Sequence, residues 1–187
     1  ALALAGQMAD AFPDNQYTPA ILLKIGEVLW EKRESDPVIF DDALRVYAWY
    51  IKACPLHQYA AQISLRVANV WYNRARTLAD EANQLPQGAE KVARNLAAQE
   101  AFKSAIPMFE HLIKNYGHTE EGLRSFRYYA ACYTSSRQYE KASEVWLRYC
   151  TQELKREEVA KRDLGAVADA KFRAAQCLVQ AGQEYSK

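Results

Sequence analysis

The chain has 187 residues, half of them hydrophobic and a quarter charged, which is the composition of an ordinary globular protein. Lys and Arg number 24 against 23 Asp and Glu, so no net field directs the chain to nucleic acid or to an anionic membrane. Gly and Pro are few, which favours long helices over strands and tight turns. No apolar run approaches the roughly 18 residues that a membrane span requires.

Local sequence patterns predict helices along the whole chain. The first segment, ALALAGQMAD, is apolar for five residues without a charged leader, so it is neither an intact signal peptide nor an anchor. The sequence is compatible with a signal peptide cleaved before Ala1. In chain order, the expected helices cover residues 1–11, 17–34, 38–53, 58–84, 89–115, 120–136, 139–158 and 163–182.

Three segments of the chain repeat one pattern when they are aligned on a turn residue, which is Pro13, Pro55 or Gly117. Thirteen residues after each turn comes a small residue, preceded by a large apolar residue and followed by another three positions later. The small residues are Gly26, Ala68 and Ala130, and a fourth copy of the pattern fits Ala174, Ala175 and Leu178. Fixed offsets of this kind indicate an internal repeat.

A second pattern precedes each turn, with an alanine, a residue four positions later and the turn residue eight further on. Three sets follow this pattern in full: Ala43 with Tyr47 and Pro55, Ala105 with Phe109 and Gly117, and Ala1 with Ala5 and Pro13. A fourth set, Ala142 with Trp146, has Leu154 at the position of the turn residue. Small residues at fixed helical positions allow two helices to approach closely, while large residues fill the space beside them. The two patterns together predict one antiparallel helix pair per repeat, stacked on its neighbours.

These two patterns resemble the tetratricopeptide repeat, in which a large-x-x-Leu-Gly-x-x-Tyr helix A is followed by an Ala-x-x-x-Phe…Pro helix B. The resemblance implies an all-α fold, a right-handed α-solenoid of stacked antiparallel helix pairs with one extended helical hairpin. It covers nearly all of residues 1–187 as a single solenoid, which we expect to be part of a longer array. The expected divisions are a helix B at 1–13, repeats at 14–55, 56–117 and 118–154, and a partial repeat at 155–187.

The 13-residue offset is longer than the family's usual 10. It resembles a bacterial envelope subgroup that includes the lipoprotein of the outer-membrane β-barrel assembly machinery and the TolA-binding periplasmic coordinator of cell division. This resemblance implies a periplasmic or outer-membrane-associated protein, with a cytoplasmic location as the alternative.

The second full repeat carries an insertion. From Ala68 to Ala105 the spacing exceeds that of the third repeat by 25 residues, and the extra sequence has one turn signal, Leu85-Pro86-Gln87-Gly88. We therefore expect a hairpin over residues 75–104 that protrudes past its neighbours, as a partner arm or as a tolerated decoration. Pro107 falls within the second helix of the hairpin, so a kink or break is expected near 103–107.

The chemistry-bearing residues predict no enzyme. Cys132, Cys150 and Cys177 occupy apolar positions of the repeat, where a free cysteine packs as a small hydrophobe. In Cys54-Pro55-Leu56-His57 a thiol and an imidazole lie three positions apart, as in half of a metal or nucleophile site. The segment aligns with the turns between repeats, however, so we expect Cys54 to pack and His57 to be a weak helix N-cap. Acid pairs such as Glu157-Glu158 are expected to be solvated. No motif for a metal, a nucleophile or a phosphate is present, and no catalytic residue, cofactor or metal ligand is predicted.

In the family that the repeats resemble, helix A lines a concave groove that binds peptides. The resemblance implies a protein or peptide partner, and amide, arginine and aromatic side chains suit a peptide backbone, a carboxylate and an apolar side chain. The expected contact residues are Gln62, Asn69, Tyr72, Asn73, Arg124, Arg127, Thr134 and Phe172. Leu65, Tyr128 and Asp169 do not fit the carboxylate clamp of the chaperone-binding members.

The sequence thus favours a non-enzymatic scaffold or adaptor that binds a partner segment in the groove, in an envelope assembly. Two alternatives stand beside it. The chain could be a structural subunit of a large complex that uses its edges and its hairpin, or a regulatory helical domain of a longer enzyme.

Overall fold

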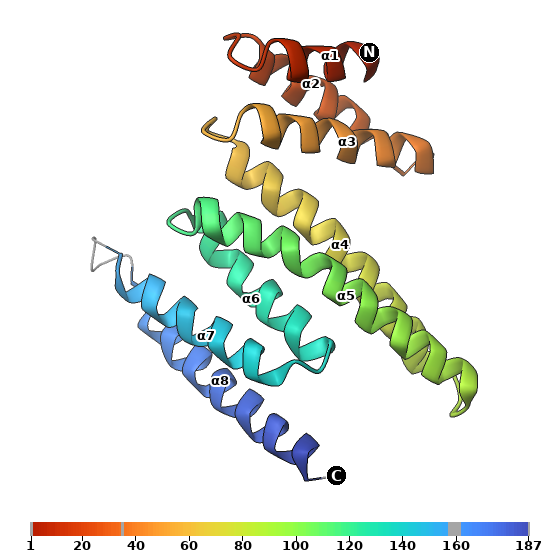
Figure 1. Cartoon of the computed structure of the whole chain (residues 1–187), viewed down its shortest axis with the longest axis vertical. Coiled ribbons are helices and arrows are strands. Elements are labelled where there is room, and N and C mark those ends of the chain that lie inside the picture. Colours follow the sequence, from red (N-terminus) through yellow and green to blue (C-terminus); the bar gives the residue numbers. More distant parts are fainter. Residues whose placement is uncertain (1, 35, 157–161, 187) are drawn as a thin grey trace. The chain divides into compact units, whose positions relative to one another are not determined.

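The computed structural model describes residues 2–34, 36–156 and 162–186, and within them the regular secondary structure is helical throughout (Figure 1). The all-α prediction is therefore confirmed. The helices are α1 (Leu2–Ala11), α2 (Thr18–Glu31), α3 (Pro37–Ala53), α4 (Ala60–Gln84), α5 (Ala89–Tyr116), α6 (Glu120–Ser135), α7 (Tyr139–Leu154) and α8 (Leu164–Tyr185).

The predicted helix boundaries agree with the observed ones to within a few residues. Asp36 accepts a hydrogen bond from Val38 N at 2.8 Å and starts α3, and Thr119 caps α6 by accepting from Gly122 N at 3.1 Å. The start of the first predicted helix at Ala1 and the acid pair Glu157-Glu158, which ends the predicted helix 139–158, lie outside the described residues.

Pro107 does not break its helix, so the expected break near 103–107 is not observed. α5 runs without interruption through Pro107, with Ala105 and Phe109 fully buried on either side. A proline in a helix interior removes one backbone hydrogen bond, and burial of the neighbouring side chains offsets that loss.

The chain divides into two compact units, Ala1–Val67 and Ala68–Lys187, with the boundary inside α4. In the first unit, α1 packs on α2 and α3, and α2 packs on α3. The core of this unit is formed by Ala5, Leu22, Val46, Tyr47 and Tyr50, all with 0% exposure.

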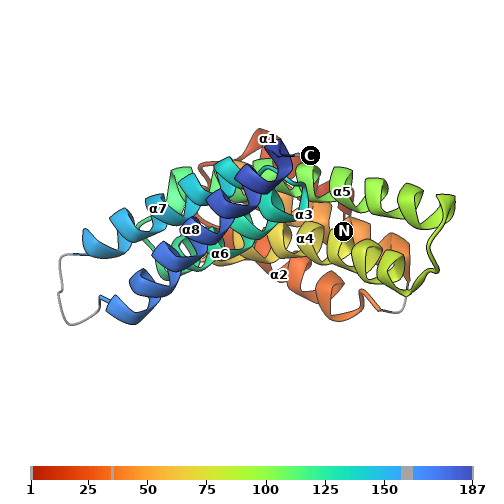
Figure 2. The same cartoon turned by 90° about the horizontal axis from the view of Figure 1, so that it is seen from below.

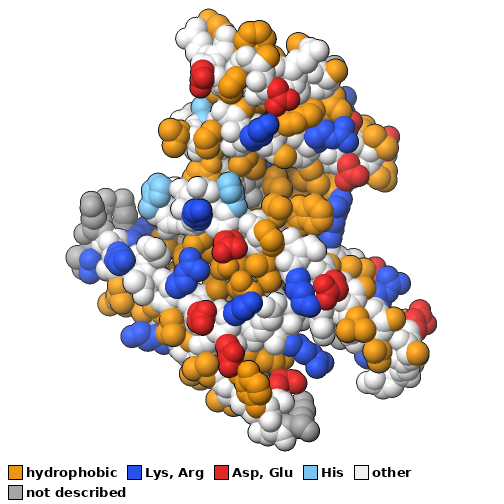
Figure 3. Space-filling model, viewed as in Figure 1, with side chains coloured by type: hydrophobic (Ala, Val, Ile, Leu, Met, Phe, Trp, Pro, Cys, Tyr) orange, Lys and Arg blue, Asp and Glu red, His pale blue; other side chains and the backbone are white. Residues whose placement is uncertain are grey.

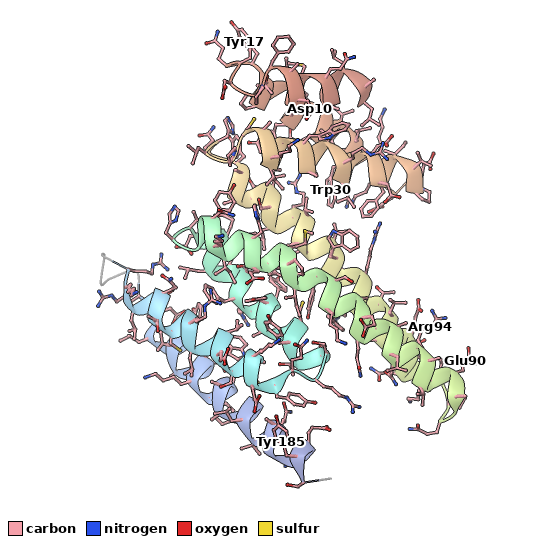
Figure 4. The ribbon with its side chains drawn as sticks, in the orientation of Figure 1. Asp10, Tyr17, Trp30, Glu90, Arg94 and Tyr185 are labelled. Carbon is pink, nitrogen blue, oxygen red and sulfur yellow. The ribbon has the colours of Figure 1, made fainter. Side chains whose placement is uncertain are left out.

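A close contact between a glycine and an aromatic ring joins α2 to α3. A Cβ built on Gly26 would lie 2.5 Å from Cε1 of Tyr47, so the ring occupies the space that any side chain would need. Arg66 Nη1 donates to Tyr47 Oη at 2.7 Å, which holds the ring in place. The Arg66 guanidinium also lies over Trp30, which Figure 4 labels on α2.

In the second unit each helix from α5 onward packs on the next, so that α5 contacts α6, α6 contacts α7, and α7 contacts α8. Phe109, Leu112 and Phe126 are fully buried in its core.

The four free cysteines of the chain are buried, which confirms the expectation that they pack as small hydrophobes. They are Cys54, Cys132, Cys150 and Cys177.

The α4–α5 hairpin is the longest element, with helices of 25 and 28 residues. Within the second unit its tip extends past α6 and α7 (Figures 1 and 2). Alanines fill the space between the two helices, since Ala75, Ala82 and Ala98 are buried. Near the tip Arg94 forms an ion pair with Glu81 at 3.4 Å, and Figure 4 labels Arg94 and Glu90 there.

The aligned small positions of the repeat are buried in the first three copies and not in the fourth. The small residues Gly26, Ala68 and Ala130 are buried, and so are the alanines Ala43, Ala105 and Ala142. The fourth small residue, Ala175, is exposed.

No helix in the described part of the chain is both long and apolar enough to cross a bilayer.

Replacing Gly26 with alanine should destabilise the first unit, because the added Cβ would collide with the buried Tyr47 ring. Overpacking of this kind costs about 1–3 kcal/mol. Gly182 provides the matched control, since a Cβ there meets nothing within 4 Å and alanine in a helix interior is favoured over glycine by roughly 0.5–1 kcal/mol. Urea denaturation of Gly26→Ala and Gly182→Ala should show opposite shifts, and a neutral Gly26→Ala would contradict the close contact.

The free energy of unfolding should fall at alkaline pH. Burial raises the pKa of Cys132 from 9.0 to about 12, so the folded chain keeps this proton while the unfolded chain loses it. Stability should therefore decline from about pH 9 towards pH 12, by at most about 1.4 kcal/mol per pH unit for this thiol. Urea denaturation at several pH values should show that the free energy of unfolding falls less steeply with pH in Cys132→Ala than in the unaltered chain. An unchanged slope would contradict the raised pKa of Cys132.

Candidate functional site

A charged pocket of about 390 Å³ lies in the second unit between α6, α7 and the start of α8. It brings arginines, carboxylates and aromatic rings together. Its lining comprises Glu120, Leu123, Arg124, Arg127, Trp146, Tyr149, Glu153, Arg156, Asp163, Gly165, Ala166 and Asp169.

The carboxylates of the pocket already have partners. Glu153, which is only 2% exposed, lies 3.3 Å from Nη1 of Arg156 and accepts a hydrogen bond from Asp163 N at 2.9 Å. Arg156 also donates through Nη2 to Glu120. Asp163 accepts from Ala166 N at 2.8 Å and so caps α8. The buried charge of Glu153 is thereby neutralised, as a buried carboxylate requires.

Asp169 is engaged as well. Its Oδ2 lies 2.7 Å from Nε of Arg173, one turn further along α8, and the guanidinium of Arg173 lies 5.6 Å from the ring centroid of Trp146. Thus each of the four carboxylates that line the pocket has a hydrogen-bond or ion-pair partner within the chain.

Arg124 and Arg127 differ from these groups. They lie one turn apart on α6 and are exposed, and among residues 2–34, 36–156 and 162–186 neither guanidinium has an ion-pair partner. Two neighbouring guanidiniums offer several N–H donors in a planar fork that fits a carboxylate. The pocket therefore has free cationic donors and satisfied anions.

Aromatic side chains form the apolar wall of the pocket. Trp146 is buried and Tyr149 is half-buried, and their rings meet edge to face with centroids 6.5 Å apart. Burial, with the charges of Glu153 and Asp163, raises the pKa of Tyr149, and Arg127 opposes this shift. The phenol is therefore neutral near pH 7, and the wall is suited to an apolar side chain beside the arginines.

On the face of the second unit that Figure 3 shows, Lys and Arg side chains are interspersed with Asp and Glu. In the described part of the chain, no three His, Cys, Asp or Glu side chains are grouped closely enough to hold a metal ion.

The structure places two of the sequence-predicted contact residues, Arg124 and Arg127, in the pocket. Tyr72 is instead packed between Phe102 and Tyr128, with ring centroids 5.7 and 5.2 Å away. Thr134 bonds the carbonyl oxygen of Ala130 on its own helix. These two side chains have structural partners and are not in the pocket.

The remaining predicted residues lie elsewhere. Gln62, Asn73 and Phe172 are exposed, Phe172 at 61%, and none of them lines the pocket. Asn69 is half-buried, and its side-chain oxygen is buried without a hydrogen-bond partner in the part of the chain that the structure describes.

The Glu153–Arg156 pair was not predicted, although its i, i+3 spacing is a local signal in the sequence. Its burial could not be predicted from that spacing, because the further partners Glu120 and Asp163 belong to other helices. Cys54 is buried as expected, but the imidazole of His57 is not a helix cap. Its Nδ1 lies 2.5 Å from the hydroxyl of Tyr50, and α4 begins only at Ala60. The Cys54–His57 segment is therefore a turn whose two end residues pack, while Leu56 between them is 98% exposed.

No family model, curated protein or solved structure matches the chain. Support for a repeat therefore comes from the chain itself, from the fixed offsets and from the burial of the residues Gly26, Ala68 and Ala130.

Replacing Arg156 with alanine should lower the thermal midpoint of unfolding, because the buried Glu153 would lose its charged partner. Adding Glu153→Gln to that variant should recover part of the loss, since a neutral amide costs less to bury than an unpaired carboxylate. Differential scanning calorimetry would measure both, with the exposed Arg148→Ala as the control. A double variant no more stable than Arg156→Ala would contradict this account.

Proposed function

We propose that the chain is a non-enzymatic scaffold or adaptor of the tetratricopeptide type, a right-handed α-solenoid of stacked antiparallel helix pairs that binds a segment of a partner protein. The burial of Gly26, Ala68 and Ala130, thirteen residues after three turns, supports this proposal. So does the packing of α5, α6, α7 and α8, each on the next. The offset of 13 residues between turn and small residue supports a place in an envelope assembly, with the protein periplasmic or associated with the outer membrane.

The partner segment binds in the pocket between α6, α7 and α8. The observation that carries this assignment is the contrast between free arginines and satisfied carboxylates. Arg124 and Arg127 have no ion-pair partner among the described residues, whereas the pocket's carboxylates are bonded within the chain. An acidic ligand gains charge-assisted hydrogen bonds there without displacing an internal partner.

The ligand is an acidic peptide segment with an apolar side chain near its carboxylate. The carboxylate pairs with Arg124 and Arg127, and the apolar side chain lies on the wall that contains Trp146 and Tyr149. Tyr72 does not belong to this site, because Phe102 and Tyr128 already cover its ring.

A second candidate surface is the tip of the α4–α5 hairpin. Val92 and Leu96, one turn apart on α5, are 58% and 56% exposed. Exposed apolar side chains in one stripe mark contact surfaces in assemblies. This observation favours the alternative of a structural subunit that contacts its neighbours through the hairpin.

The pocket proposal predicts that Arg124→Ala with Arg127→Ala weakens binding of an acidic peptide about tenfold or more. Hydrogen bonds to charged groups contribute roughly 1.5–3 kcal/mol each, which corresponds to that loss. Fluorescence anisotropy with labelled peptides of equal length, identical except for Glu, Gln or Lys at the charged positions, measures the effect. The Glu peptide should bind most tightly, and its affinity should fall at high salt.

Arg76→Ala with Arg94→Ala is the matched control, since it removes the same charge from the hairpin and leaves the pocket intact. If the Glu and Gln peptides bind equally, or if the two double variants behave alike, the pocket is not the binding site.

A further inference from the structure

The charged pocket of the second unit has a cationic side and an anionic side. α6 supplies the free guanidiniums of Arg124 and Arg127, and the start of α8 supplies the carboxylates of Asp163 and Asp169. α7 packs on both helices and lines the pocket between them. A ligand in the pocket therefore meets charges of opposite sign on its two sides.

Three of the four carboxylates that line the pocket are paired with arginines. Glu120 and Glu153 share Arg156. Asp169 is paired with Arg173, one turn further along α8. The charges of these three carboxylates are therefore compensated within the chain.

Asp163 is the exception among the carboxylates of the pocket. It is exposed, and among residues 2–34, 36–156 and 162–186 it has no ion-pair partner. The hydrogen bond that it accepts from Ala166 N at 2.8 Å uses Oδ1 and caps α8. This bond satisfies a backbone donor but supplies no cation. The negative charge of Asp163 therefore remains available to a ligand, through Oδ2.

The neighbouring glycine leaves Asp163 accessible from the pocket. Gly165 also lines the pocket, and a Cβ at this position would lie only 3.3 Å from Oδ1 of Asp163. A side chain there would crowd the carboxylate. Glycine therefore keeps this side of Asp163 open to a ligand.

Tyr149 of α7 lies within electrostatic reach of both free charges. Burial raises the pKa of its phenol, the carboxylates of Glu153 and Asp163 add to this effect, and the guanidinium of Arg127 opposes it. The free cation on α6 and the free anion at the start of α8 thus act on the same part of the pocket. A group that lies on the Tyr149 ring has Arg127 on one side and Asp163 on the other.

We propose that the pocket binds a peptide segment that carries both an acidic and a basic side chain, with an apolar side chain between them. The carboxylate pairs with Arg124 and Arg127, the apolar side chain lies on Tyr149, and the basic group pairs with Asp163. In an extended segment, alternate side chains project to one face roughly 7 Å apart, so residues i, i+2 and i+4 reach the three parts of the pocket in turn. This inference rests on the acidic-ligand function proposed above and adds the basic group to it.

The probes are fluorescein-labelled peptides of equal length in which Glu, Leu and a variable residue occupy alternate positions, separated by Ser. The variable residue is Lys, Gln or Glu. Anisotropy titrations with the full chain should give the tightest binding for the Lys peptide, followed by the Gln peptide and then the Glu peptide. The Lys and Gln peptides should differ about threefold in affinity, which is the contribution of one exposed ion pair.

Asp163→Asn should abolish this difference, because asparagine keeps the N-cap hydrogen bond but carries no charge. Its affinity for the Gln peptide and its thermal midpoint of unfolding should stay close to those of the unaltered chain. Asp36→Asn is the matched control, since Asp36 is the N-cap of α3 in the first unit and does not line the pocket. This variant should keep the full preference for the Lys peptide.

The outcomes separate this inference from the function on which it rests. If the Lys and Gln peptides bind equally, while Arg124→Ala with Arg127→Ala weakens both, the acidic ligand stands and the basic group is ruled out. A preference for Lys that survives in Asp163→Asn, or one that is lost in Asp36→Asn, would also overturn the inference. If none of the peptides binds the unaltered chain, the proposed function fails and the inference fails with it.

Discussion

The ring of Tyr47 lies directly against Gly26, and the packing of the first unit depends on this contact. Because glycine has no side chain, α2 and α3 approach until the ring fills the space where a Cβ would be. The ring is then held by Arg66, which also lies over Trp30. In the second unit the fully buried Ala130 occupies the same place in the repeat. Close approach at a small residue thus explains why it recurs thirteen residues after each turn.

The same packing decides which charges remain available for a ligand. Glu153 is buried at the end of α7, and its carboxylate must be neutralised there. Arg156 supplies the charge and Asp163 the backbone donor, so Arg156 is not free to bind a partner. Arg124 and Arg127 are left with exposed guanidiniums beside an aromatic wall. The candidate site is therefore a consequence of how the helix ends are stabilised.

The sequence was a good guide to local structure and a partial guide to the site. Helix positions followed from turn residues and caps, such as Asp36 and Thr119, because these act within a few residues of chain. The continuity of α5 through Pro107 did not follow, since the helix is held by burial against other segments. In the site, Arg124 and Arg127 were found from the repeat register. Tyr72 was misleading for the site, because its exposure depends on Phe102 and Tyr128, which are distant in the sequence.

The sequence by itself determined that the chain is helical, where its helices begin and end, and which small residues are buried at Gly26, Ala68 and Ala130. It could do so because these properties depend on local propensity and on a fixed repeat. Only the tertiary structure decided that Glu153 and Arg156 neutralise each other, that Arg124 and Arg127 stay free, and that Ala175 is exposed. Ion pairing and exposure depend on which side chains from other helices come within a few ångströms, and a linear pattern does not contain that information.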